Sequence, residues 1–232
     1  MKEKTINERL IELQDLKYKS FTEKLIPRLN KERIIGVRMP ELRKLAKRLE
    51  KENKMEVQNF LKNLPHFYHE ENNLHALLIE NIKNFEEAAE EVKKFLPHID
   101  NWATCDLFSP YIFRSGQENR KRGYGLIMNW LDSEEEYIVR FAIVMLLKNY
   151  MKENFRVKDM KNISEIKSDK YYVNMAIAWY MSTALAEHYD DAVRIIEEKS
   201  MDRRVHNKTI QKAVESLRIN SEKKEYLKRL KI

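Results

Sequence analysis

Apolar residues recur at three- and four-residue spacing along nearly the whole chain, the spacing that places side chains on one face of a helix. The pattern is interrupted about every 15 to 20 residues, as it is in stacked pairs of helices. Asp100, Ser133 and Asp190 stand at predicted helix starts, where a short polar side chain can cap the first turn. The pattern predicts helices over residues 3–17, 19–29, 40–52, 55–63, 70–82, 85–95, 101–113, 117–131, 134–151, 155–166, 170–186, 190–199, 202–218 and 221–231.

The composition agrees with a chain built from helices alone. Four glycines and five prolines are too few for the turns of a many-stranded sheet, while Leu, Ile, Glu, Lys and Arg dominate, as in packed amphipathic helices. No linker rich in Gly and Ser divides the chain. We therefore expect an all-α fold, a right-handed α-solenoid of helical repeats that forms one domain over residues 1–232.

Three large side chains are spaced almost evenly along the predicted repeats. Trp102, Arg140 and Trp179 are separated by 38 and 39 residues, close to the roughly 40-residue period of HEAT-type helical pairs. Equivalent positions on successive repeats would project toward one concave surface. Asp106 would join them, because four residues after Trp102 a helix returns to the same face. The sequence therefore predicts a site that contains two indoles, a guanidinium and a carboxylate.

Two interpretations of this cluster remain open from the residues alone. Leu107, Phe108 and Tyr111 follow Asp106, and burial beside them would keep water scarce and let the carboxylate stabilise a nearby positive charge. Alternatively, Trp102 is a core residue and Asp106 pairs with Arg140 to fix the register of the repeats.

The net charge of +7 is concentrated at the two ends of the chain. Residues 1–50 hold 14 basic against 8 acidic side chains, and residues 201–232 hold 10 against 4, so the middle is net acidic. Basic ends on a curved solenoid could bind an extended polyanion, which favours a nucleic acid, although lysine-rich helices also serve simply to solvate a surface.

Two segments carry the basic residues on a single predicted helix face. After Gly36, Pro40 suits a first helical turn whose buried stripe would leave cations exposed, and a helix start beside cations can seat a phosphate. The second segment, near the other end, places its cations opposite Ile210, Ala213, Val214 and Leu217. The predicted DNA-binding residues are Arg38, Arg43, Lys44 and Lys47 in the first segment and Arg203, Arg204, Lys208 and Lys212 in the second.

Other features argue against membrane, secreted and metal-dependent classes. The charged N-terminus has no signal-peptide core, and the longest apolar run, Phe141 to Leu147, is too short to span a bilayer. The single Cys105 suits a reducing compartment. His66, His69 and His75 lack the accompanying ligands of a zinc site. We expect a soluble cytoplasmic protein that needs no metal or other cofactor.

Four segments together resemble the bacterial DNA alkylation repair family, the AlkD-like glycosylases built of HEAT-like repeats. They are Gly36 to Lys47, the Trp102 and Asp106 pair, Arg140 with the apolar run that follows it, and Ala176 to Trp179. The resemblance implies a nucleoid-associated monomer whose concave basic groove holds duplex DNA, damaged or branched, and releases cationic N3- or N7-alkylated purines without flipping the base.

The resemblance also implies a role for each site residue. Asp106 would stabilise the oxocarbenium-like deoxyribose and position water, Trp102 and Trp179 would pack against the sugar and backbone, and Arg140 would contact a phosphate. Four positions depart from the family pattern: Met175 and Ser182 replace basic residues, Ala178 replaces Gly, and Pro27 replaces an aromatic. Two alternatives therefore stay open, a non-catalytic DNA-binding paralogue and a protein-interaction solenoid.

Overall fold

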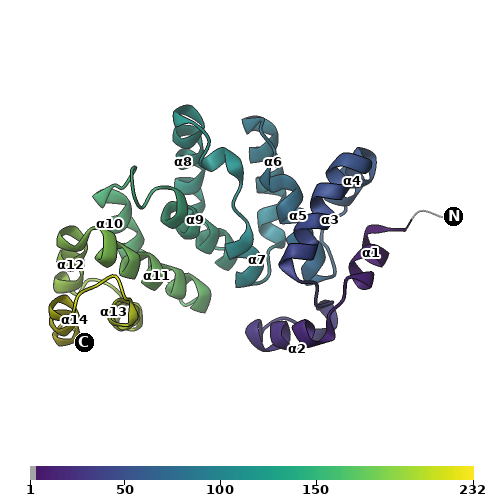
Figure 1. Cartoon of the computed structure of the whole chain (residues 1–232). Helices are drawn as coiled ribbons and strands as arrows, with labels where there is room; N and C mark the ends of the chain where they lie inside the picture. Colours follow the sequence, from purple (N-terminus) through teal and green to yellow (C-terminus); the bar gives the residue numbers. More distant parts are fainter. Residues whose placement is uncertain (1–3) are drawn as a thin grey trace. The chain divides into compact units, whose positions relative to one another are not determined.

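The computed structural model describes residues 4–232 (Figure 1), which form helices joined by short loops. Within these residues the only β pairing is an isolated antiparallel bridge between Gln14 and Val37. The α-helices are α1 (Ile6–Glu12), α2 (Leu16–Leu25), α3 (Met39–Glu52), α4 (Lys54–Lys62), α5 (His69–Glu80), α6 (Phe85–Phe95), α7 (Trp102–Leu107), α8 (Gln117–Leu131), α9 (Glu136–Asn149), α10 (Val157–Glu165), α11 (Tyr171–Glu187), α12 (Tyr189–Glu198), α13 (Arg203–Glu215) and α14 (Ser221–Arg229). Three 3-10 helices are η1 (Lys31–Arg33), η2 (Leu96–His98) and η3 (Tyr111–Phe113).

The predicted all-α class is confirmed, and each predicted helix has a counterpart. The predicted helix 3–17 is too long, because α1 ends at Glu12 and Asp15 instead caps α2, accepting the Tyr18 N–H at 3.0 Å. The predicted helix 101–113 is also too long. Helix α7 ends at Leu107, since the backbone becomes extended at Phe108, shortly before Pro110.

The predicted N-caps are displaced by one or two residues. The caps of α7, α9 and α12 are Asn101, Glu135 and His188 rather than Asp100, Ser133 and Asp190. At the other end of the chain, α13 stops at Glu215, so Leu217 lies outside the helix and is 98% exposed instead of packing on its apolar face.

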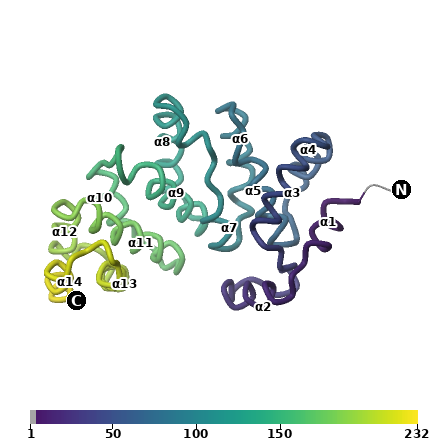
Figure 2. Tube along the Cα trace, in the orientation of Figure 1, coloured from purple at the N-terminus to yellow at the C-terminus, as the bar shows by residue number. Residues whose placement is uncertain are grey.

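The chain, traced in Figure 2, divides into two compact units, Met1–Gly123 and Tyr124–Ile232. In the first unit α5 is the central helix and packs against α1, α3, α4, α6 and α7. In the second unit α11 is central and packs against α9 and α13 on either side and against α10 and α12. These two helices position the site residues of their units. No helix within residues 4–232 is long and apolar enough to cross a bilayer.

Helix α5 is buried along nearly its whole length although seven of its twelve residues are polar. Because it is surrounded by five helices, its polar groups need partners inside the protein. Glu70 finds its partners in a loop 33 to 35 residues earlier and Asn73 bonds Thr104 of α7, whereas Glu71 accepts the N–H groups of the adjacent Phe67 and Tyr68. Its buried polar residues are His69, Glu70, Glu71, Asn72, Asn73 and His75.

Two imidazoles of the first unit share a hydrogen bond in the core. His66 Nε2 lies 2.9 Å from His75 Nδ1, and the rings stack on Phe60 and Phe95 respectively. Burial lowers the pKa of His66 to about 4 and the pKa of His75 to about 3. Both rings are therefore neutral at physiological pH, and this pair is held by aromatic packing.

These depressed pKa values predict acid sensitivity. Below pH 6.5 the two imidazoles bind protons in the unfolded chain but stay neutral in the folded protein. Their contribution to the free energy of unfolding is therefore complete above pH 6.5 and is lost as the pH falls toward 4. The loss should be on the order of 3 kcal/mol from His66 alone. Urea unfolding at pH 7.5, 6.0 and 4.5 measures it. The His75→Phe variant should be less stable at pH 7.5 yet lose less on acidification, and equal losses in variant and wild type would contradict the prediction.

Candidate functional site

Helix α7 carries two of the predicted site residues of the first unit. Trp102 and Asp106 lie one turn apart on it, and both side chains are partly exposed. The Trp102 indole is fixed at its polar edge, since Nε1 donates to the carbonyl of Leu25 at 3.3 Å. Both side chains reach the surface from one short helix, so Trp102 is not simply a core residue.

A buried polar network holds α7 against α5. Asn101 caps α7 by accepting the Thr104 N–H at 2.9 Å, and its side-chain amide lies 3.3 Å from His69 Nδ1. The Thr104 hydroxyl donates to Asn73 at 2.8 Å, and the Asn73 amide lies 2.9 Å from His69 Nε2. Desolvation lowers the pKa of His69. These four side chains fix the rotation of α7 and hence the direction of Asp106.

The start of the first basic helix, α3, is positioned by a carboxylate of α5. Glu70 accepts the N–H groups of Ile35 at 2.9 Å, Gly36 at 2.7 Å and Val37 at 3.3 Å. Gly36 has φ +94°, and a Cβ there would meet the Lys19 side chain at 2.6 Å. Only glycine therefore suits this loop, which leads directly to the predicted phosphate seat.

The cations of α3 are exposed, as the amphipathic pattern predicted, while Leu42, Leu45, Ala46 and Leu49 are buried. Most of them already have acidic neighbours. Arg38 pairs with Asp15 at 2.8 Å, Lys44 with Glu41 at 2.8 Å, and Arg43 approaches Glu80 at 3.7 Å. Such exposed pairs are weak and can be exchanged for a phosphate. Lys47 is also exposed on this face.

In the second unit, Arg140 on α9 is buried, with 6% of its surface exposed. Its guanidinium donates to the backbone carbonyl of Tyr172 on α11 at 2.9 Å and lies 5.9 Å from the Tyr172 ring centroid. Arg140 therefore ties α9 to α11 from a buried position.

Trp179 on α11 and Lys212 on α13 line one cavity of about 340 Å³. Ser182 and Glu215 also line it, and the Ser182 hydroxyl turns back to the Trp179 carbonyl at 2.9 Å. The pKa of Lys212 is lowered by burial first, then by Lys208, with Arg140 a smaller cause. Lys212 and Glu215 thus lie beside the indole, and positive charge from Lys208 and Arg140 acts on Lys212.

The remaining predicted cations lie along α13. Arg203 and Arg204 are exposed in its first turn, and Lys208 is partly exposed. Arg203 donates from Nε to the carbonyl of Ile232 at 3.0 Å. Since it is nine residues before Lys212, it projects from the opposite side of the helix. Of this group, Lys208 and Lys212 are therefore the pair that the structure brings together.

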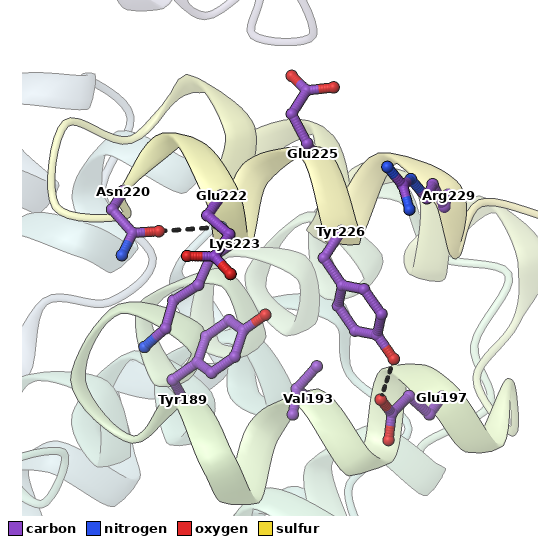
Figure 3. Close-up of a pocket in the computed structure, with 9 residues that line it drawn as sticks. All are labelled: Tyr189, Val193, Glu197, Asn220, Glu222, Lys223, Glu225, Tyr226 and Arg229. Atoms are coloured by element: carbon purple, nitrogen blue, oxygen red, sulfur yellow. Dashed lines mark hydrogen bonds between the residues drawn. The ribbon is translucent and has the colours of Figure 1, made fainter.

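A cavity of about 640 Å³ elsewhere in the second unit lies between α12 and α14 (Figure 3). Two tyrosines line it, with Lys223 at 3.9 Å from the Tyr189 ring centroid and Tyr226 hydrogen-bonded to Glu197. It contains none of the predicted site residues, and three of its lining residues are carboxylates. Its mixed charge does not match a polyanion.

A family model described as DNA alkylation repair enzyme matches residues 6–217 of the chain. The chain belongs to the DNA alkylation repair enzyme family. The comparisons with curated proteins and with solved structures found no match. Membership of the DNA alkylation repair family implies DNA as substrate or partner and confirms the resemblance found in the sequence. The residues predicted on that basis lie in both units, with Trp102 and Asp106 in the first and Arg140 and Trp179 in the second, so the four-residue site remains a prediction.

In this member of the DNA alkylation repair family, other residues that the sequence patterns did not single out as site residues position α7 and the loop before α3. His69, Asn73 and Thr104 orient α7, and Glu70 shapes the loop before α3. One signal was present: a run of six polar residues interrupted by a single Leu inside a predicted helix is unusual unless those residues have buried partners.

Proposed function

We propose that the protein is a DNA glycosylase that releases positively charged N3- or N7-alkylated purines from duplex DNA without flipping the base. The observation that carries this proposal is the pair on α7: a partly exposed indole and a partly exposed carboxylate, one turn apart, whose helix is anchored by a buried network. Within a DNA alkylation repair family, these are the groups with which a sugar cation can be stabilised.

The proposed chemistry requires little of the protein beyond electrostatics. The bond between C1′ and the purine nitrogen breaks, and its electron pair neutralises the cationic purine, which leaves. The deoxyribose becomes oxocarbenium-like, and Asp106 stabilises that charge while the indole offers its negative face. Water then adds at C1′ and loses its proton, which gives an abasic site. No base-shaped pocket is needed, in contrast to enzymes that flip the base.

The cavity beside Trp179 supports a phosphate contact in the second unit. Members of this family commonly carry a basic residue where this chain has Ser182. Here Lys212 of α13 lines the same cavity, with Arg140 near enough to lower its pKa. We infer that α13 supplies the cation that α11 lacks.

Lys212→Ala should weaken binding to a 15-base-pair duplex several-fold. Because one phosphate contact is lost, the slope of log affinity against log salt concentration should become shallower by about 0.9. Fluorescence anisotropy between 50 and 250 mM NaCl measures both quantities. Lys161→Ala, which removes an exposed lysine of α10 in the same unit, serves as the control. An unchanged slope for Lys212→Ala would show that this lysine makes no phosphate contact.

Base release tests the enzymatic proposal directly. Duplex DNA that carries 7-methylguanine or 3-methyladenine is incubated with the protein, and the free base is detected by chromatography. Release faster than in protein-free duplex supports a glycosylase. Salt-sensitive duplex binding without release would instead identify a non-catalytic DNA-binding member of the family, an alternative that the departures at Pro27, Met175, Ala178 and Ser182 keep in view.

A further inference from the structure

Helix α2 lies at the edge of the first unit (Figure 2). It exposes a set of large apolar side chains. Of its ten residues only Thr22 is buried, whereas Leu16 is 68%, Phe21 56% and Leu25 41% exposed. Single exposed apolar residues are ordinary, but several on one short helix mark a surface that binds something.

Two of these exposed residues form an ordered row with Tyr18, which is partly exposed. Tyr18, Phe21 and Leu25 follow one another at three- and four-residue spacing and so share a face of α2. The Tyr18 and Phe21 ring centroids are 6.0 Å apart with only 28° between the ring planes. At the far end, Trp102 donates its Nε1 proton to the Leu25 carbonyl. We name Tyr18, Phe21 and Trp102 the aromatic row.

Positive charge surrounds the aromatic row. Residues 15–38 hold seven basic and three acidic side chains, and one of the acidic residues, Asp15, pairs with Arg38 at 2.8 Å. Lys17 and Lys24 are exposed and flank Phe21 on the helix surface at four- and three-residue spacing. The Arg38 guanidinium lies 5.1 Å from the Tyr18 ring centroid, where it extends the row with a cationic, planar group. Aromatic faces among cations match a ligand that combines flat rings with negative charge.

We propose that the aromatic row and its flanking lysines bind the unpaired bases of a single DNA strand, as found at a gap, a frayed end or a displaced strand. Every nucleobase has a stacking face, so recognition would be tolerant of sequence, while the lysines follow the phosphates. This site shares Trp102 and Arg38 with the proposed duplex contact but adds Tyr18, Phe21 and the two lysines of α2, and it does not depend on glycosylase activity.

The test is binding of a fluorescein-labelled 12-nucleotide oligothymidine, followed by anisotropy in 50 mM NaCl. Phe21→Ala should weaken binding about ten-fold or more, since it removes one stacking partner. Tyr171→Ala is the control: its ring is 54% exposed but lies on α11 in the second unit, and binding should change less than two-fold. An abasic strand of the same length should bind wild type about ten-fold more weakly than oligothymidine.

Two outcomes would overturn the proposal: equal affinity of wild type and Phe21→Ala for oligothymidine, or equal affinity of wild type for the abasic strand. Absence of oligothymidine binding by wild type would do the same and would leave the surface to a protein partner. Because Phe21 is exposed, its replacement should not alter folding, which circular dichroism checks. Excision from duplex DNA by Phe21→Ala should stay within two-fold of wild type, and Asp106→Asn should bind oligothymidine normally, so each proposal can fail without the other.

Discussion

Replacing Asp106 with Asn is expected to slow release of 7-methylguanine from duplex DNA by about 10²- to 10³-fold. The amide has nearly the shape of the carboxylate but no net charge, so it loses the electrostatic stabilisation of the oxocarbenium-like sugar. Only the transition state carries that charge, and the effect should therefore fall on the rate of the chemical step. Single-turnover measurements with protein in excess over duplex isolate this step from product release.

The control for this substitution is Asp132→Asn, at an exposed aspartate in the loop after α8. It makes the same chemical change and should leave the rate within two-fold of wild type. Binding to undamaged duplex should be unchanged or slightly tighter in Asp106→Asn, since a negative charge that faces the phosphates is removed. Release by Asp106→Asn at the wild-type rate would contradict the catalytic role.

The helices of this protein could be predicted from its sequence because their apolar periodicity is strong. Segments 85–95 and 117–131 begin and end where the pattern predicted. The failures lie where local signals compete. The predicted helix 3–17 includes Asp15, although an aspartate favours the cap position, and in the structure Asp15 caps α2. The predicted helix 101–113 includes Pro110, although the residue before a proline disfavours the helical conformation, and in the structure α7 ends at Leu107.

The burial of α5 could not be predicted in the same way. Its periodicity is weak, and the groups that satisfy its polar side chains come from elsewhere in the chain: the amide groups bound by Glu70 lie 33 to 35 residues earlier. A pattern of neighbours along the sequence contains no information about such partners. What the polar run does indicate is that hydrogen bonds of this helix will be specific and hard to replace.

The candidate site likewise contains residues whose proximity the sequence predicts and residues whose proximity depends on the packing of distant helices. Trp102 and Asp106 could be predicted to share a face, because four residues on one helix settle it. The approach of Arg140 and Ser182 to Lys212 depends on how α9, α11 and α13 pack, which only the structure gives. The suggested pairing of Asp106 with Arg140 involves one residue from each unit and stays a prediction.

The loop that precedes α3 is where a substitution is expected to have the largest effect on the free energy of unfolding. Glu70 is 1% exposed and receives three consecutive backbone N–H groups, from Ile35, Gly36 and Val37. Without the carboxylate these donors have no partner in a buried position, where an unsatisfied group costs about 1 to 3 kcal/mol. The loop also leads to Arg38 and the exposed cations of α3, so its geometry matters for the proposed DNA contact as well as for folding.

Glu70→Ala should therefore lower the free energy of unfolding by about 3 to 5 kcal/mol, somewhat less than three separate penalties because water can enter the space left behind. Urea unfolding at pH 7.5 measures the change. Glu70→Gln should lose less, since one oxygen still accepts while the new amide N–H₂ faces donors. Glu90→Ala, at an exposed glutamate of α6, should stay within about 0.5 kcal/mol of wild type. If Glu70→Ala proved no less stable than Glu90→Ala, the carboxylate would not be the group that holds this loop, and the fixed start of α3 would need another cause.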